Sequence, residues 1–100
     1  MPELVLAFIW PDGSEDRLYS PSRAIAGHLA PGDAYPLAEF LDRSRAGLEA
    51  ASARVEARYG VPCRRARAEI ARIERRASGF TGDADGRVRM LPESPTGDRP

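Results

Sequence analysis

The sequence contains no Lys, Asn or Gln, and each of its 15 basic residues is Arg. Lys and Asn codons are AT-rich, so this composition indicates a GC-rich coding sequence rather than selection of Arg for bidentate contacts. Cys63 is the only Cys, which excludes an internal disulfide framework and permits a reducing compartment. His28 is the only His, and no cluster of ligand side chains accompanies it, so neither a metal nor a cofactor is expected.

Long apolar runs are also missing. The start of the chain has no basic segment and reaches Pro-Asp-Gly at residues 11–13, which is not the pattern of a signal peptide. No run approaches the roughly 18 apolar residues of a membrane-spanning helix. We therefore expect a cytoplasmic protein that does not enter a membrane.

The residues that are present suffice for one small domain. The chain has 100 residues, of which 42% are hydrophobic, so it is expected to fold around one modest core. This domain is predicted to span residues 1–91, and the polar, Pro-rich residues 92–100 are predicted to form a flexible tail. The formal net charge is zero, which excludes a global attraction to nucleic acid or anionic membranes.

A hairpin is predicted near the N-terminus. Residues 4–10 form a short apolar run with β-branched and aromatic members, which indicates a buried strand. Pro-Asp-Gly at residues 11–13 is a turn signal, and residues 15–19 alternate weakly, which favours a return strand. Residues 20–36 hold three Pro and two Gly, and we expect a structured connection with one helical turn.

Two helices are predicted to follow. The first runs from residue 36 or 37 to about residue 59, with Gly60 suited to the position after its end. The second runs from residue 62 to about residue 78, and its apolar side chains recur in a heptad seam. The seam comprises Cys63, Ala66, Ile70, Ile73, Ala77 and Phe80. The facing stripe of the first helix comprises Leu37, Phe40, Leu41, Ser44, Leu48, Ala51, Val55 and Tyr59.

The predicted architecture is α+β. A short connection makes the two helices antiparallel neighbours. Residues 87–91 alternate and are expected to add a third strand, because a two-stranded ribbon is marginal alone. The order strand, strand, helix, helix, strand thus predicts a three-stranded antiparallel sheet packed against a two-helix hairpin. Four side chains are expected to be nearly inaccessible: Leu48, Val55, Ile70 and Ile73.

The second helix concentrates positive charge. Residues 54–76 carry eight Arg and three Glu. Five of these Arg fall opposite the seam: Arg64, Arg65, Arg72, Arg75 and Arg76. This face is either an anion or nucleic-acid surface or a solvated face with pairs such as Arg65–Glu69. No aromatic residue interleaves the Arg side chains, which favours the solvated face, and we expect Arg64, Arg72, Arg75 and Arg76 to be exposed and dispensable for folding.

Cys63 admits two interpretations. At the start of a helix and next to Arg64 and Arg65, its thiol could be a reactive thiolate. It also holds the first seam position, where Cys acts as a small hydrophobe, and no second Cys could complete a redox pair. The sequence has no nucleophile elbow and no Gly-rich phosphate loop, so no catalytic residue and no enzymatic activity are predicted.

The stretch "WPDGSEDRLYSPS", residues 10–22, contains more than a turn requires. A rigid Ser-Pro-Ser after an edge strand presents hydroxyls at a fixed place, and Trp and Tyr near Arg are typical of interface hot spots. One interpretation is a partner-binding surface formed by Trp10, Tyr19, Ser20 and Ser22, the last three exposed beside the sheet edge. The other is a turn followed by core residues, and the sequence leaves both open.

Three stretches resemble a known family: "WPDGS…YSPS", "PGDAYPLAEFLDRSRAGLEAASARVEARYG" and, after Cys63, "AEIARIE". The family comprises small bacterial proteins described as nitrogen-starvation-response proteins and encoded in nitrilase gene clusters. The resemblance covers residues 3–91. Its motif residues add Asp12, Gly13 and Tyr35 to the predicted partner-binding set. Relatives often carry Cys where this chain has Leu18, so a dithiol or metal role is not carried over.

The resemblance implies a context and no reaction. Family members are encoded beside a nitrilase, a radical-SAM protein, an acetyltransferase and a flavin-dependent oxidoreductase. We therefore expect a non-catalytic accessory or regulatory protein that binds an enzyme of the same gene cluster. The alternative is a nucleic-acid-binding regulator that uses the Arg-rich face of the second helix. A third class, an enzyme or small-molecule carrier, would need a buried polar pocket, and a homodimer is compatible with the sequence.

Overall fold

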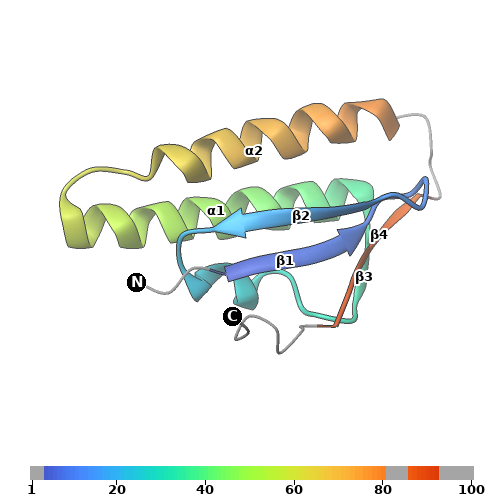
Figure 1. Ribbon diagram of the computed structural model, residues 1–100, viewed down its shortest axis with the longest axis horizontal. Helices are drawn as coiled ribbons and strands as arrows, with labels where there is room; N and C mark the ends of the chain where they lie inside the picture. The colour runs from blue at the N-terminus through green and yellow to red at the C-terminus, as the bar shows by residue number, and fades with distance from the viewer. Residues whose placement is uncertain (1–3, 81–85, 93–100) are drawn as a thin grey trace.

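The computed structural model describes residues 4–80 and 86–92 and shows one antiparallel sheet and two long helices. Figure 1 shows the two helices running antiparallel and side by side along the sheet. The α+β class and the helical hairpin are therefore confirmed. The predicted tail lies outside the described residues from residue 93 onward.

The N-terminal hairpin forms as predicted. Strand β1, Leu4–Ile9, pairs antiparallel with strand β2, Glu15–Ser20. The Trp10 amide donates a 2.8 Å hydrogen bond to the Ser14 carbonyl and closes the turn. Gly13 has a φ of 90°, a left-handed conformation that Gly adopts without steric cost.

The sheet has four strands, so the prediction of three is wrong. The added strand is β3, Ala34–Pro36, which pairs antiparallel with β4, Arg87–Met90, and completes the order β2-β1-β4-β3. Hydrogen bonds from the Gly32 amide to the Met90 carbonyl and from the Met90 amide to the Asp33 carbonyl extend this pairing. A strand of three residues that ends in Pro has too few side chains to show an alternation, which is why the pattern did not predict it.

The connection between β2 and β3 contains the expected helical turn. It is a 3₁₀ helix, η1, at Arg23–Gly27. Ile25 and Leu29 are fully buried, and His28 is half-buried. The connection is therefore part of the core rather than a linker.

Helix α1, Leu37–Tyr59, has the bounds that the sequence predicts. Gly60 ends it with a φ of 89°, and the Gly60 amide donates to the Glu56 carbonyl at 2.8 Å. The buried residues of its predicted stripe are Phe40, Ser44, Leu48 and Ala51. This stripe packs against the sheet and against the second helix.

Helix α2, Arg64–Ala77, begins two residues later than predicted. Cys63 precedes it with an extended backbone (φ −83°, ψ 113°), and the Cys63 amide donates to Ser52 Oγ at 3.1 Å. The fully buried seam residues are Ala66, Ile73 and Ala77, and the half-buried ones are Cys63, Ile70 and Phe80. The seam is confirmed, although Ile70 is less buried than predicted.

The connected ends of α1 and α2 project beyond the ends of β1 and β2 (Figure 1). At this end Tyr59 is 61% and Val61 is 62% exposed, and Val55 is half-buried. The prediction that Val55 is nearly inaccessible is therefore wrong, because the sheet does not extend beneath this part of the helical hairpin.

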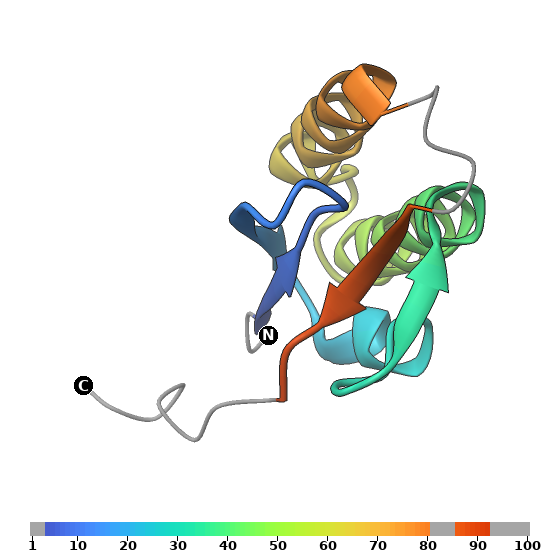
Figure 2. The same ribbon diagram turned by 90° about the vertical axis from the view of Figure 1, so that its right-hand side faces the viewer.

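The core lies between the sheet and the two helices (Figure 2). An aromatic cluster fills one end of it. The Phe8 ring centroid lies 5.2 Å from that of Trp10 and 5.0 Å from that of Phe40. The Phe80 ring, in the 3₁₀ helix η2 at Ser78–Phe80, stacks on Trp10 at 5.4 Å. Aromatic residues bury more area than other side chains, so this cluster contributes strongly to stability.

Gly47 in α1 packs closely against η1 and the residue that follows it. A Cβ atom at Gly47 would lie 2.5 Å from Ile25 Cδ1 and 3.3 Å from His28 Cβ. We expect Gly47→Val to destabilise the protein by about 1–3 kcal/mol, because the close-packed core must move to admit the new side chain. Ala46→Val, at an exposed neighbouring position, should cost less than about 1 kcal/mol. Urea unfolding measures both, and equal losses would contradict the packing argument.

Candidate functional site

The predicted partner-binding residues divide into buried and exposed members. Ser20 and Ser22 are 0% and 3% exposed, so the expectation that they lie on the surface is wrong. Trp10 and Tyr35 are also buried, at 1% and 7%. Asp12 and Gly13 are exposed and Tyr19 is half-buried. The binding role of this set stays a prediction, and its burial shows that most of the set belongs to the core.

The two Ser hydroxyls of the Tyr-Ser-Pro-Ser corner are used internally. Ser20 Oγ donates to the Ser22 carbonyl at 2.7 Å, and Ser22 Oγ accepts from the Ala24 amide at 3.0 Å. The second bond caps the start of η1. Ser20 also lies two residues beyond Leu18 in β2, and therefore points to the same buried face. These hydrogen bonds explain why the corner is folded inward rather than presented to solvent.

Asp12 stabilises the exposed tip of the hairpin. Its Oδ1 accepts hydrogen bonds from the Ser14 amide at 2.9 Å and from the Ser14 hydroxyl at 2.6 Å. Both bonds favour the charged carboxylate and lower the pKa of Asp12 below its ordinary value. An Asp that binds the backbone two residues later is typical of turns.

Tyr35 joins β3 to the connection before it. Its hydroxyl accepts from the Ala30 amide at 2.9 Å. The Arg43 guanidinium lies 4.8 Å from the Tyr35 ring centroid and donates to the His28 carbonyl at 3.1 Å. These contacts hold the connection against α1, which supports a structural role for Tyr35.

A charged cluster joins the β1–β2 hairpin to α2. Trp10 Nε1 donates to Asp16 Oδ2 at 2.9 Å, and Arg72 Nη1 donates to the same oxygen at 3.1 Å. Arg72 also pairs with Glu69 at 3.0 Å, and hydrogen bonding to Glu69 raises the pKa of Arg72. We call Asp16, Glu69 and Arg72 the hairpin clamp. Their sequence separation, 56 residues between Asp16 and Arg72, explains why no local pattern revealed it.

The hairpin clamp also occupies the free edge of β2. The Tyr19 amide donates to Glu69 Oε2 at 2.8 Å, and Arg72 Nη2 donates to the Arg17 carbonyl at 2.5 Å. Edge strands otherwise present unpaired backbone groups that attract further strands. Side chains of α2 therefore take the place that another strand would take.

The hairpin clamp predicts an acid-sensitive contribution to stability. Burial raises the pKa of Asp16, but hydrogen bonds from Trp10, the Arg17 amide and Arg72 outweigh burial and hold this pKa below its ordinary value. Folding that lowers a carboxyl pKa gains stability above the unfolded pKa and loses it as the pH falls through the folded pKa. We expect Asp16→Asn to cost about 1–3 kcal/mol at neutral pH and to match wild type at strongly acidic pH.

Urea unfolding of both proteins between neutral and strongly acidic pH measures this difference. Asp42→Asn, on the exposed side of α1, is the control and should stay within about 0.5 kcal/mol of wild type at neutral pH. A cost of Asp16→Asn that is the same at every pH would contradict a role for the Asp16 charge.

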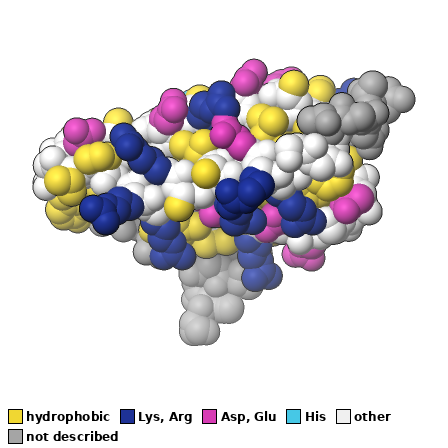
Figure 3. All heavy atoms as spheres, turned by 90° about the horizontal axis from the view of Figure 1, so that it is seen from above, with side chains coloured by type: hydrophobic (Ala, Val, Ile, Leu, Met, Phe, Trp, Pro, Cys, Tyr) yellow, Lys and Arg dark blue, Asp and Glu magenta, His cyan; other side chains and the backbone are white. Residues whose placement is uncertain are grey.

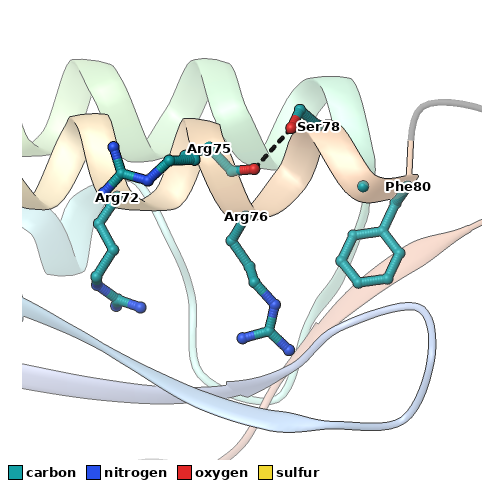
Figure 4. Close-up of a pocket in the computed structure, with 6 residues that line it drawn as sticks. Arg72, Arg75, Arg76, Ser78 and Phe80 are labelled. Carbon is teal, nitrogen blue, oxygen red and sulfur yellow. Dashed lines mark hydrogen bonds between the residues drawn. The ribbon is translucent and has the colours of Figure 1, made fainter.

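An open groove of about 550 Å³ borders the Arg face of α2. It is lined by Arg72, Arg75, Arg76, Ser78, Gly79 and Phe80. Figure 4 shows Arg72 and Arg76 reaching from α2 toward the hairpin. Arg76 Nη2 donates to Ser14 Oγ at 2.8 Å, and its guanidinium lies 5.6 Å from the Trp10 ring. Two of the three guanidinium groups at this groove are thus already engaged with the hairpin.

The Arg face is not a continuous basic surface. The Arg residues that are exposed as expected are Arg64, Arg75 and Arg76. Arg72 is half-buried in the hairpin clamp, so the expectation of exposure is wrong for it. Arg65 lies 3.8 Å from the Tyr19 ring centroid, and Glu69 pairs with Arg72. Figure 3 shows the basic side chains of this side separated by acidic and apolar ones.

Cys63 is half-buried and packs against the core at the start of α2. This position fits its predicted place in the seam, and its reactivity stays a prediction. Within residues 4–80 and 86–92, no three His, Cys, Asp or Glu side chains gather as a metal ion would require. Over the same residues, no helix combines the length and apolar character needed to span a membrane.

A further surface, the outer sheet face, was not predicted from the sequence. It is the side of the sheet that faces away from the helices. Its outward residues on the first, second and fourth strands are Val5, Ala7, Ile9, Glu15, Arg17, Tyr19, Arg87 and Arg89. Val5 is 53% exposed, and Ala7 and Ile9 are half-buried. The run at residues 4–10 is therefore buried on one face only, and apolar residues at both odd and even positions are its sequence signal.

Within the described residues, fold and site together define a small α+β protein with a structural charged cluster and an open sheet face that carries the apolar residues Val5, Ala7 and Ile9. Residues 6–92 match the family described as Nitrogen starvation-induced protein NitG. The chain belongs to this family, and the resemblance to nitrogen-starvation proteins is confirmed. Comparison with curated proteins and with solved structures gave no match.

Proposed function

We propose that this chain is a non-catalytic accessory or regulatory protein that acts during nitrogen starvation by binding a partner protein. The partner is an enzyme encoded in the same nitrilase-type gene cluster, and both proteins are cytoplasmic. Family membership supports the starvation context. The gene-cluster context comes from the resemblance described above.

The observation that carries the proposal is the apolar row on the outer sheet face. Antiparallel sheets with one solvated face usually place polar residues on it. Here three successive outward positions of an interior strand are apolar: Val5, Ala7 and Ile9. Tyr19 lies directly opposite Val5 and extends the row onto β2. Contiguous apolar surface of this kind marks interaction sites more often than scattered single residues do.

The engagement of the hairpin clamp supports a non-catalytic role. Asp16 and Glu69 could serve acid–base chemistry, but both carboxylates bind Arg72 and thereby fix the hairpin to α2. The same contacts weaken the alternative of a nucleic-acid regulator. Arg72 is held by the clamp and Arg76 by Ser14, so fewer cations of the Arg face remain for phosphates.

The proposal predicts that Val5→Ser reduces partner capture. Val61→Ser is the matched control, because Val61 is 62% exposed at the far end of the helical hairpin. We expect the tagged Val5→Ser variant to capture its main partner from nitrogen-starved cells at least about fivefold less well than wild type, as a truncated interface contact would. Val61→Ser should capture normally. Equal capture by both variants, with unchanged melting temperatures, would place the working surface elsewhere.

A further inference from the structure

We infer that the partner segment bound by the outer sheet face is acidic and lies across the face rather than pairing with its edge. This inference rests on the proposed function and names the chemistry of the partner. The charges beside the apolar row, the closed edge of β2 and the poor fit of two other occupants support it.

The apolar row lies between positive charges. Arg17 is directly opposite Ala7 on β2, and Arg89 is directly opposite Ile9 on β4. Cross-strand neighbours of this kind have Cβ atoms about 5 Å apart, so the long Arg side chains are within reach of the space above the row. Arg87 shares the face with Arg89, since the two residues are two apart in β4.

Within the part of the chain that the structure describes, these cations are open to a ligand. Arg17, Arg87 and Arg89 are all exposed. None of the three has an ion-pair partner among residues 4–80 and 86–92. Glu15 is the one acidic side chain that shares the face on β1, β2 and β4. An apolar segment flanked by Asp or Glu would therefore contact the apolar row and pair its acids with these Arg side chains.

The edge of β2 does not favour strand addition. A peptide that extends a sheet needs free backbone amides and carbonyls at its edge. The Tyr19 amide and the Arg17 carbonyl already bind Glu69 and Arg72. The opposite edge, β3, has three residues and ends in Pro36, which has no amide hydrogen. Binding across the face needs neither edge.

A second copy of the chain fits the face poorly. Two outer sheet faces brought together would each present three Arg against one Glu, and like charges across an interface are costly. Single-stranded nucleic acid fits poorly as well, because its binding relies on aromatic side chains that stack with bases. Tyr19, the aromatic residue of this face, is already stacked against Arg65 at 3.8 Å.

The test places p-benzoylphenylalanine, a photo-activated cross-linker, at Val5 of the full chain in nitrogen-starved source cells. The same cross-linker at Val61 controls for non-specific contacts. The segment that is cross-linked from position 5 and not from position 61 is sequenced and synthesised as a peptide. Its affinity for the full chain is then measured at low and high salt.

We expect a segment with several Asp or Glu beside apolar residues. Arg17→Glu with Arg89→Glu should weaken its binding by about tenfold or more, and added salt should weaken binding to the wild type. Arg54→Glu with Arg64→Glu, both exposed on the helices, makes the same change in net charge and should bind like wild type. Replacing the acids of the peptide with Arg should restore binding to the Arg17→Glu, Arg89→Glu protein.

The outcomes separate this inference from the proposed function. The cross-linked segment could lack acids, with its binding abolished by Val5→Ser and unchanged by Arg17→Glu with Arg89→Glu. That result would overturn the acidic partner and leave the proposed function standing. A cross-link from position 5 to a second copy or to RNA overturns both. So does an absence of any cross-link above the level at position 61.

Discussion

Ile73→Asp should unfold the protein at room temperature. Ile73 is 1% exposed and lies in the middle of the α2 seam, within the core cluster. Its removal forfeits about 1.5–3 kcal/mol of apolar burial. The introduced carboxylate must also be buried without a partner or be protonated, which costs several kcal/mol more. Because a domain of this kind is stable by only about 5–15 kcal/mol, the sum approaches or exceeds the whole stability.

Circular dichroism and the fluorescence of Trp10, the sole Trp, measure this outcome. We expect loss of helical signal and a red shift of emission as Trp10 leaves its buried site. Ala71→Asp, an exposed position on the same helix, is the control for introducing Asp into α2 and should remain folded. Ile73→Val should cost only about 0.5–1.5 kcal/mol. A folded Ile73→Asp protein with an unchanged melting temperature would show that the seam is not the core of the hairpin.

The long periodic elements could be predicted because their physics is local. Seven-residue periodicity along α2 fixes which side chains meet α1, and Gly60 ends α1 through a backbone conformation that Gly adopts readily. β3 could not be predicted this way. Its three residues pair with a strand more than fifty positions later, and neither alternation nor composition encodes such a pairing.

The candidate site was harder to predict. The sequence gives its residue types, but not whether each side chain points to the core or to solvent. Ser, Tyr and Trp in a Pro-rich corner are compatible with a surface or with a satisfied interior. Strand alternation predicts part of this orientation, because Ser20 is two residues from the buried Leu18 and therefore shares its face. The same alternation applied to Val5, Ala7 and Ile9 would have indicated an apolar face opposite the core.

Contacts between segments that are distant in the sequence cannot be predicted from local patterns. The hairpin clamp depends on α2 running beside the edge of β2, a consequence of how two layers pack rather than of any local pattern. For this reason an Arg face that looks solvated in sequence includes Arg72, a residue that binds two carboxylates and a backbone carbonyl. Charge clusters on helices are therefore best assigned after the neighbouring strand is known.

Trp10→Ala should be the most damaging single truncation within residues 10–22. Trp10 is 1% exposed, and its ring contacts Phe8, Phe40 and Phe80 at centroid distances of 5.2, 5.6 and 5.4 Å. Large aromatic-to-Ala changes in a core cost about 3–5 kcal/mol. The variant also removes the indole donor that holds Asp16, and so weakens the hairpin clamp.

Trp10→Phe separates these two effects. It keeps a ring against Phe8 and Phe40 but removes the hydrogen bond to Asp16, so we expect a smaller loss of about 1–3 kcal/mol. Part of that loss should disappear at strongly acidic pH, because the Asp16 charge that accepts the bond is then neutralised. Urea unfolding followed by circular dichroism gives the order wild type, Trp10→Phe, Trp10→Ala. The opposite outcome is a Trp10→Ala protein that is as stable as wild type but no longer captures its partner. Trp10 would then be a contact residue, and the binding surface would lie at the turn between β1 and β2 instead of on the outer sheet face.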